Sequence, residues 1–506
     1  MRPLRATAAA LLAGGLAVGF GVPALGQETG RERERDRRIE LRRSVEPRSS
    51  DPSEGERARE RSQDDALAGT RDRDEGADGD DEERAADAEG EGDRERDETA
   101  EREEDRAARA EPVDPLEEDP DALREPEIGP YDPLGVRVGS FLLFPQVEVG
   151  ALFTDNVFES SDNRRSDRAL VMQPGIGFRS NWSRHSLSGE ANAELVRHEE
   201  FSSEDEDNID AALRGRLDVS RRTNIEGEVA FEIEQESRGS INVPDAAAEA
   251  PDEETRSAAL QVNHRINRVT LSLRGEIVEE EFEDVALAGG GTFDNAQRDN
   301  TERELTARIA REFKPGVGVF VEGSVNEIEF TNPVPAGGVS RDSEGYEVLA
   351  GVSLEIGGKI TGEIGVGYAK QTPDAASLQE IDGLILNGNL TWRASGLTTL
   401  RFTAQSEVDT TIVADSVGSL NQTVEVAVEH ALRRNVILGA SLGYEIDDFG
   451  GADIEEHELT ATVSAEYLLN RVLALAATYT YTDFDRTGNG DDYTENEVLV
   501  GLRVRR

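Results

Sequence analysis

The chain has 506 residues, a formal net charge of -51 and only 36% hydrophobic residues. A chain this polar rarely fills one large solid core, so either part of it is disordered or its fold has polar surfaces on two sides. It has no cysteine, which excludes disulfides and thiolate metal sites, and its negative charge makes nucleic acid a poor partner because phosphates would be repelled.

The first residues have the three parts of a secretory signal. Arg2 and Arg5 supply positive charge, residues 6–23 are small and apolar, and Ala24-Leu25-Gly26 offers small residues for cleavage. The alternative is a retained membrane anchor, but the stretch is Gly-rich and only weakly hydrophobic. We therefore predict a signal peptide over residues 1–26, cleaved on export.

The second zone, residues 27–130, contains no Phe, Tyr or Trp and is dominated by Asp, Glu and Arg. Such a segment buries too little apolar surface to offset the entropy lost on ordering. We predict a disordered, charged periplasmic segment that serves as a tether or spacer and contacts a periplasmic partner.

From Tyr131 onward, apolar and polar residues alternate. In residues 224–234 (NIEGEVAFEIE) the apolar side chains except Ala230 fall on one face and four glutamates on the other, and residues 435–447 and 457–468 repeat the pattern. A period of two is typical of a β-strand with one apolar and one polar face. Short turns, as at 221–223 and 433–435, alternate with long acidic loops such as 237–254, 283–300 and 484–496.

This alternation of short turns and long loops predicts an all-β fold, a transmembrane antiparallel β-barrel of about 18 strands in the outer membrane, over residues 131–506. The short turns are expected on the periplasmic side. A β-propeller blade has a similar repeat length, but each repeat here has two long strands whose second face is ionised. Strands are expected to start near Pro145, Asp167, Arg184, Asn208, Asn224, Arg256, Arg268, Asn300, Gly316, Gly345, Lys359, Ile381, Thr398, Leu420, Asn435, Glu455, Arg471 and Asn496.

Several stretches resemble the β-barrel porin type 2 family of Gram-negative outer-membrane proteins. Residues 131–158 look like that family's first strand, and 180–195, 381–392 and 468–482 look like its later hairpins. The resemblance covers essentially all of 131–506 and implies a barrel. Because some members are associated with exopolysaccharide secretion, it also implies passage of polymer or small solutes.

The chain departs from this family pattern in two ways. It ends Val504-Arg505-Arg506 instead of in an aromatic residue, and aromatic residues make up only 5% of it. The aromatic girdles expected at the membrane interfaces are therefore thin. The candidates are Trp182, Phe313, Trp392 and Tyr467 at the inner interface, and Phe153, Tyr479 and Tyr481 at the outer interface.

We find no catalytic constellation and expect no enzyme activity. The five histidines have no metal-binding spacing, and the Asp-rich loops lack the spacing of a calcium loop, so no metal or cofactor is predicted. The alternative, a Ser/His/Asp set like that of outer-membrane hydrolases, stays open because sequence alone does not show spatial proximity.

The polar face of the strands is expected to line an aqueous channel, because a barrel of about 18 strands is wide enough to leave one. Carboxylates on this face outnumber arginines, and rings of carboxylates favour cations. The alternative is that the charges only pair across strands. The pore-lining candidates are Glu148, Glu190, Glu194, Asp210, Glu226, Glu228, Glu232, Glu276, Glu322, Glu363, Glu407, Glu425, Glu429, Arg179, Arg214, Arg274, Arg308 and Arg401.

Two functional hypotheses follow. The first is a pore in contact with outer-membrane lipid that passes exopolysaccharide or small, preferably cationic solutes. The second is a non-conducting barrel that displays loops or anchors the envelope. The sequence does not separate them, because conductance depends on whether the long loops fold into the barrel.

Overall fold

The computed structural model describes residues 130–506 except 245, 333–338, 412, 414–415, 453 and 488–491. The predicted signal peptide and the predicted disordered segment lie outside the described residues. Among the residues that the structure describes, no helix is both long and apolar enough to cross a membrane.

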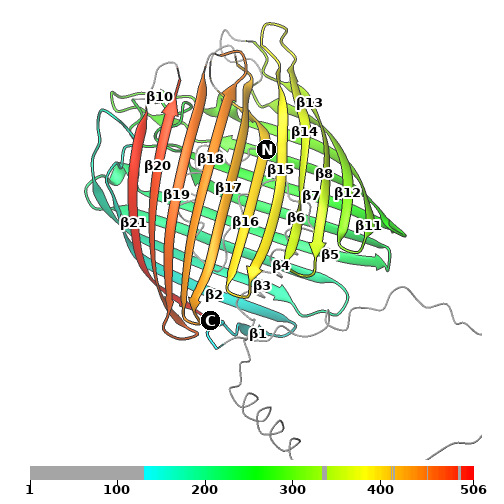
Figure 1. The fold of residues 1–506 in the computed structure, drawn as a ribbon. Coiled ribbons are helices and arrows are strands. Elements are labelled where there is room, and N and C mark those ends of the chain that lie inside the picture. The colour runs from blue at the N-terminus through cyan, green and yellow to red at the C-terminus, as the bar shows by residue number, and fades with distance from the viewer. Residues whose placement is uncertain are drawn as a thin grey trace, which may run out of the picture. The chain divides into compact units, whose positions relative to one another are not determined.

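Eighteen long antiparallel strands form the wall of a barrel (Figure 1). They are β2 (Phe141–Thr154), β3 (Asp167–Ser180), β4 (Ser186–His198), β5 (Glu206–Ser220), β6 (Thr223–Gln235), β7 (Asp252–Ile266), β8 (Val269–Phe282), β11 (Asn300–Lys314), β12 (Val317–Phe330), β13 (Ser343–Ile356), β14 (Ile360–Pro373), β15 (Ile381–Ser395), β16 (Thr398–Thr410), β17 (Gly418–Arg433), β18 (Val436–Phe449), β19 (Glu455–Leu468), β20 (Leu473–Arg486) and β21 (Tyr493–Arg505).

The barrel closes where the last wall strand pairs with the first. Strand β21 runs antiparallel to β2 from Gln146, opposite Arg505, to Thr154, opposite Glu497. A short strand, β1 (Val136–Val138), pairs with the start of β2 and lies outside this closed ring. Closure leaves no free edge strand, which is what lets a sheet cross a bilayer without unpaired backbone groups.

The connections gather at two rims (Figure 1). One rim, here called the turn rim, has short connections such as 221–222 and 315–316, whereas the other, the loop rim, has long ones such as 236–251 and 283–299. Gly316 shows why a turn residue matters: its φ is +75°, and a Cβ there would lie 2.1 Å from the Glu355 carbonyl oxygen. Several strands start at the predicted residue, as β3 does at Asp167. Others start a few residues away, as β2 does at Phe141 instead of Pro145.

The wall has an apolar outer face and a polar inner face. Leu260, Ile309 and Val366 are each 59% exposed on the outside, as expected for side chains that meet lipid. Of the aromatic candidates, Trp182 and Trp392 are exposed near the turn rim and Phe153 near the loop rim, whereas Tyr479, predicted at the outer interface, is exposed halfway along β20. Alternation along each strand therefore separates a lipid face from a lumen face.

The hydrogen-bond ladder of the wall is interrupted between two strands. Strand β15 pairs with β16 only along Gly388–Ser395, so its loop-rim half, residues 381–387, has no ladder partner on β16. Side chains bridge this seam instead: the Leu386 amide donates to Ser406 Oγ at 3.0 Å, and the Ser406 amide donates to Asn387 Oδ1 at 2.9 Å. An apolar cluster that includes Ile381 and Ile385 packs beside the seam.

Candidate functional site

The predicted pore-lining residues all lie on the face opposite the exposed apolar side chains, which is the lumen face of the closed barrel. Several of them form cross-strand ion pairs. Arg214 on β5 places Nη1 3.1 Å from Glu190 on β4 and Nε 2.9 Å from Glu228 on β6. One guanidinium thus joins three neighbouring strands, and the two carboxylates on either side of it are compensated.

Further arginines also form ion pairs on the lumen face, within a strand or across strands. Arg274 lies 2.8 Å from Glu276 on its own strand, and Arg308 pairs with Glu322 at 3.4 Å and with Glu363. The pairs Glu226–Arg216 at 3.2 Å and Glu148–Arg503 at 2.7 Å use arginines outside the predicted pore-lining set. Pairing across strands therefore accounts for many of the predicted carboxylates.

The contacts of the other predicted residues include hydrogen bonds from neutral side chains and one arginine–aromatic contact. Glu194 accepts a hydrogen bond from Gln173, Glu407 accepts one from Gln405 at 2.6 Å, and Asp210 accepts one from Asn192 at 3.0 Å. The Arg179 guanidinium stands 5.4 Å from the Phe144 ring centroid. Three members share the lumen face of β16 and β17, namely Arg401, Glu425 and Glu429, and Glu232 lies directly opposite Asp210.

Carboxylates that the prediction missed enlarge the acidic excess. Most lie near the loop-rim ends of strands; two of them precede the predicted starts of their strands, at Asn208 and Asn496, and the other four lie within the predicted strands. The six are Glu206, Glu347, Glu445, Glu458, Glu495 and Glu497. The alternation within the predicted strands already places those four on the polar face, and a start two residues earlier would have added the other two. Within the described part of the chain, no basic side chain forms an ion pair with any of these six or with Glu194 or Glu232.

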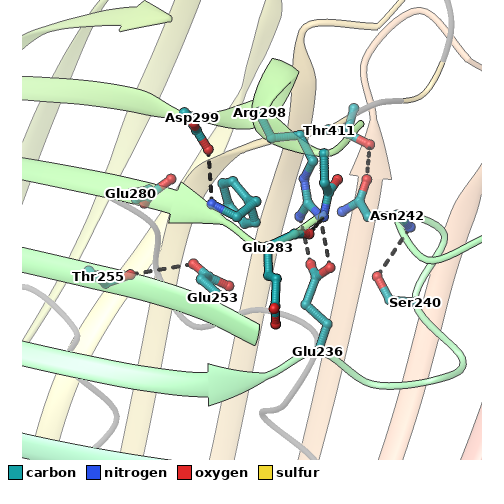
Figure 2. A network of polar contacts seen from close by, with 12 residues as sticks. Glu236, Ser240, Asn242, Glu253, Thr255, Glu280, Glu283, Arg298, Asp299 and Thr411 are labelled. Carbon is teal, nitrogen blue, oxygen red and sulfur yellow. Dashed lines mark hydrogen bonds and ion pairs between the residues drawn. The ribbon is translucent and has the colours of Figure 1, made fainter. Parts of the chain in front are cut away.

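The connection between β6 and β7, residues 236–251, crosses the loop-rim mouth of the barrel, and we call it the crossing loop. The Asn242 side chain accepts a hydrogen bond from Thr411 Oγ1 at 2.9 Å, at the end of β16 (Figure 2). Strands β6 and β16 are separated by seven wall strands in one direction round the barrel, so they stand nearly opposite each other. A loop that joins them must pass over or through the lumen.

Two more contacts hold the crossing loop to distant strands. Arg486 of β20 donates to the Gly239 carbonyl at 2.6 Å, and the Gly239 amide donates to Glu159 in the β2–β3 connection at 2.9 Å. Ser237 also donates to Glu159. Burial raises the pKa of the Glu159 carboxyl; the hydrogen bonds from Ser237 and Gly239 lower it in part, and the Glu204 charge raises it further.

The β8–β11 connection, residues 283–299, supports the crossing loop from one side. Its hairpin, β9 (Val285–Ala286) with β10 (Thr292–Phe293), packs Val285 against Val243 and Ala247. Its 3-10 turn ends at Arg298, whose guanidinium binds both carboxylate oxygens of Glu236 at 2.6 and 2.8 Å (Figure 2). The Arg298 guanidinium also lies 4.0 Å from the Phe282 ring centroid.

Together these contacts hold the crossing loop at Glu236, Gly239, Asn242 and Ala247, so this part of the chain narrows the mouth of the barrel. Among the described residues, no group of three or more His, Asp or Glu side chains is arranged to hold a metal ion.

The model of the "Putative beta-barrel porin 2" family matches residues 129–506, which include the whole barrel described above. The chain belongs to this family. Membership and the barrel fold place this porin 2 family member in the outer membrane, as predicted. No curated protein sequence matches it.

Solved structures similar to this porin 2 family member are outer-membrane barrels. OpdL of Pseudomonas aeruginosa is 11% identical with a TM-score of 0.36, and the match covers 73% of this chain and 99% of OpdL. The outer membrane protein OpdK of the same species is 11% identical with a TM-score of 0.35, covering 72% and 99%. The P. aeruginosa siderophore receptor PirA is 9% identical with a TM-score of 0.35, covering 75% and 81%.

Proposed function

We propose that this protein is a passive outer-membrane pore, not an enzyme, and that it admits small solutes and favours cations over anions. The observation that carries this proposal is a set of eight lumen carboxylates that form no ion pair with a basic side chain among the described residues. Arginines of the lumen face, such as Arg214, Arg274 and Arg308, are paired with other carboxylates. A lumen with an uncompensated negative charge attracts cations and repels anions.

The crossing loop limits the size of solute that can pass through the mouth of the barrel. Its hydrogen bonds to β16 and β20 leave only part of the mouth open, which suits a small solute better than a polymer. Exopolysaccharide, which the family resemblance suggests, would need the loop to leave its docked position. The second candidate function, a barrel that does not conduct, is favoured by the same loop contacts.

Planar-bilayer conductance of the purified protein tests the proposal. We expect a stable channel whose reversal potential in a salt gradient shows cation preference, because the lumen field is negative. The variants Glu232→Gln and Glu347→Gln should lower that preference. Glu327→Gln removes the same charge from the exposed outer face of β12 and should leave selectivity unchanged, so it serves as the matched control.

A second pair of variants separates the candidates. Asn242→Ala with Arg486→Ala removes two side chains that hold the crossing loop, and conductance should rise. A folded barrel that stays silent both with and without these side chains would reject the pore and favour the non-conducting barrel. A barrel that passes long neutral dextrans only after the loop is released would favour polymer passage.

A further inference from the structure

A cavity lies beneath the crossing loop, against the lumen face of β18 to β21. Its empty volume is about 640 Å³, a figure that includes space open to solvent. Residues of the crossing loop line it on one side, among them Ser240 and Asn242, which are labelled in Figure 2. Its wall carries Glu445, Asp447, Glu456, Glu458, Phe484 and Tyr493.

The four acidic residues of the wall form two like-charged pairs. Glu445 on β18 lies directly opposite Glu458 on β19, and Asp447 lies directly opposite Glu456 one step nearer the loop rim. Like charges in directly opposite positions destabilise a sheet. Two such pairs in succession therefore require compensation from something else.

The protein compensates one pair better than the other. Arg486 binds Glu456 at 2.6 Å, and Asp447 accepts hydrogen bonds from Asn421 and Ser419 at 3.1 and 3.2 Å. The inner pair forms no ion pair within the described residues: Glu458 accepts a hydrogen bond from Thr460 at 2.9 Å, and Glu445 Oε1 accepts one from Asn421 at 2.7 Å.

Glu445 also has an atom without a partner. Its Oε2 has no hydrogen bond in the described structure, although the residue is only 8% exposed and lines the cavity. A buried carboxylate oxygen that accepts nothing is costly, and that cost is removed by a donor placed in the cavity.

Two aromatic rings continue the row of the inner pair. Phe484 on β20 is the direct neighbour of Glu458, and Tyr493 on β21 is the direct neighbour of Phe484. Their rings stack with centroids 5.1 Å apart. A Cβ on Gly239 of the crossing loop would lie 2.9 Å from Tyr493 Cε1, so the loop backbone rests against this ring.

We propose that this cavity binds a small organic cation, a primary ammonium carried on a short apolar or aromatic group. The ammonium would lie between Glu445 and Glu458 and donate to Glu445 Oε2, while its apolar part would lie on the Phe484 and Tyr493 rings. Carboxylates alone would suit any cation, whereas an adjoining pair of rings selects one that also has apolar surface. The site does not require the barrel to conduct, so binding and conductance can fail separately.

The test is isothermal titration of the full, folded protein in detergent micelles, with empty micelles as the blank. The probes are benzylammonium, its neutral counterpart benzyl alcohol, and methylammonium, which has the charge without the ring. We expect benzylammonium to bind and benzyl alcohol not to bind. Glu445→Gln and Glu458→Gln should each weaken benzylammonium binding by at least about tenfold, because each removes a charge-assisted hydrogen bond.

A matched control and a second variant keep the test decisive. Glu327→Gln removes a carboxylate from the exposed outer face of β12, away from the cavity, and should leave the affinity unchanged. Phe484→Leu should weaken benzylammonium binding but not methylammonium binding. Each variant is first shown to be folded by its faster migration in an unheated gel sample.

Three outcomes would overturn the proposal. Benzyl alcohol that binds as tightly as benzylammonium would show that charge is not recognised. Equal affinities in the wild type and in the two Glu→Gln variants would place the ligand elsewhere. No binding of either ammonium to the folded wild type would mean that the two carboxyl groups relieve their repulsion without a ligand, for example by sharing a proton.

Discussion

Arg298 and Glu236 form an ion pair that is removed from solvent, with exposures of 1% and 5%. Their contact is bidentate, and it ties the support at residues 283–299 to the first residue of the crossing loop. A buried pair of this kind adds little stability over an apolar pair of the same shape, but loss of one partner leaves an uncompensated charge. Its main effect is therefore to specify where the crossing loop docks.

We predict that Arg298→Ala destabilises the docked loop by about 3–5 kcal/mol, because Glu236 stays buried without its cation. Amide hydrogen exchange of residues 236–251, measured on the folded barrel by mass spectrometry, should increase strongly. The double variant Glu236→Leu with Arg298→Met should recover most of the protection. Unchanged exchange in Arg298→Ala would contradict the assigned role.

Glu159 gives the docked loop a dependence on pH. It is a non-glycine residue with φ of +49°, and its buried carboxyl, whose pKa is raised by that burial, accepts hydrogen bonds from Ser237 and Gly239. In the docked state the carboxyl therefore keeps its proton at pH values where a free carboxyl has lost it. The docked state then binds more protons, so its stability is greatest at low pH and falls as pH rises through the raised pKa.

We accordingly predict that protection of residues 236–251 from exchange, corrected for the intrinsic effect of pH on exchange, is greater at about pH 5 than at about pH 8. Glu159→Gln cannot lose a proton and should show little of this difference. If the variant and the wild type depend on pH equally, other carboxyl groups control the loop.

At the scale of elements, the strands could be predicted and the crossing loop could not. Alternation with a period of two sets which face each strand residue occupies, so the lumen positions of Glu190, Glu228 and Arg308 follow from the sequence. The docking of the loop depends on pairs far apart in the chain, such as Asn242 with Thr411. No local pattern encodes such a pair.

The seam between β15 and β16 could not be predicted from the sequence either, because it depends on how the two strands meet in the closed barrel. In a membrane, a backbone polar group without a hydrogen-bond partner is costly. Side chains supply such partners at the seam: Ser406 Oγ accepts from the Leu386 amide, and Gln422 Nε2 donates to the Leu384 carbonyl at 2.6 Å. Leu384 is 71% exposed on the outer face at this point. The seam is therefore the part of the wall that depends most on individual side chains.

We predict that the Leu386 amide exchanges roughly ten times faster than the Leu390 amide, whose residue lies in the paired half of β15, a difference of about 1.4 kcal/mol in opening free energy. Ser406→Ala should increase exchange at Leu386 further, because it removes the acceptor. Backbone NMR of the deuterated barrel measures both. Equal protection of Leu386 and Leu390 would mean that the seam is as stable as a regular ladder.

At the scale of the whole molecule, the barrel has two unlike rims. The turn rim carries both ends of the wall, the start of β2 and the end of β21, while the loop rim carries the crossing loop and the cavity beneath it. An even number of strands requires both ends to lie on one side of the membrane. The direction from which the chain enters the membrane therefore fixes the orientation of the crossing loop.

Because outer-membrane barrels insert from the periplasm, which is also where the signal peptide predicted for residues 1–26 would deliver the chain, we predict that the loop rim faces the cell exterior. The protein has no cysteine, so single cysteines can be labelled without background. Gly289 at the loop rim is exposed and has open space where a side chain would begin, whereas the adjacent Gly290 has a positive φ that disfavours substitution. Ser395 is exposed at the turn rim. On intact cells, an impermeant maleimide should label Gly289→Cys but not Ser395→Cys, and both should react after the outer membrane is permeabilised. The reverse pattern on intact cells would invert the barrel and place the crossing loop in the periplasm.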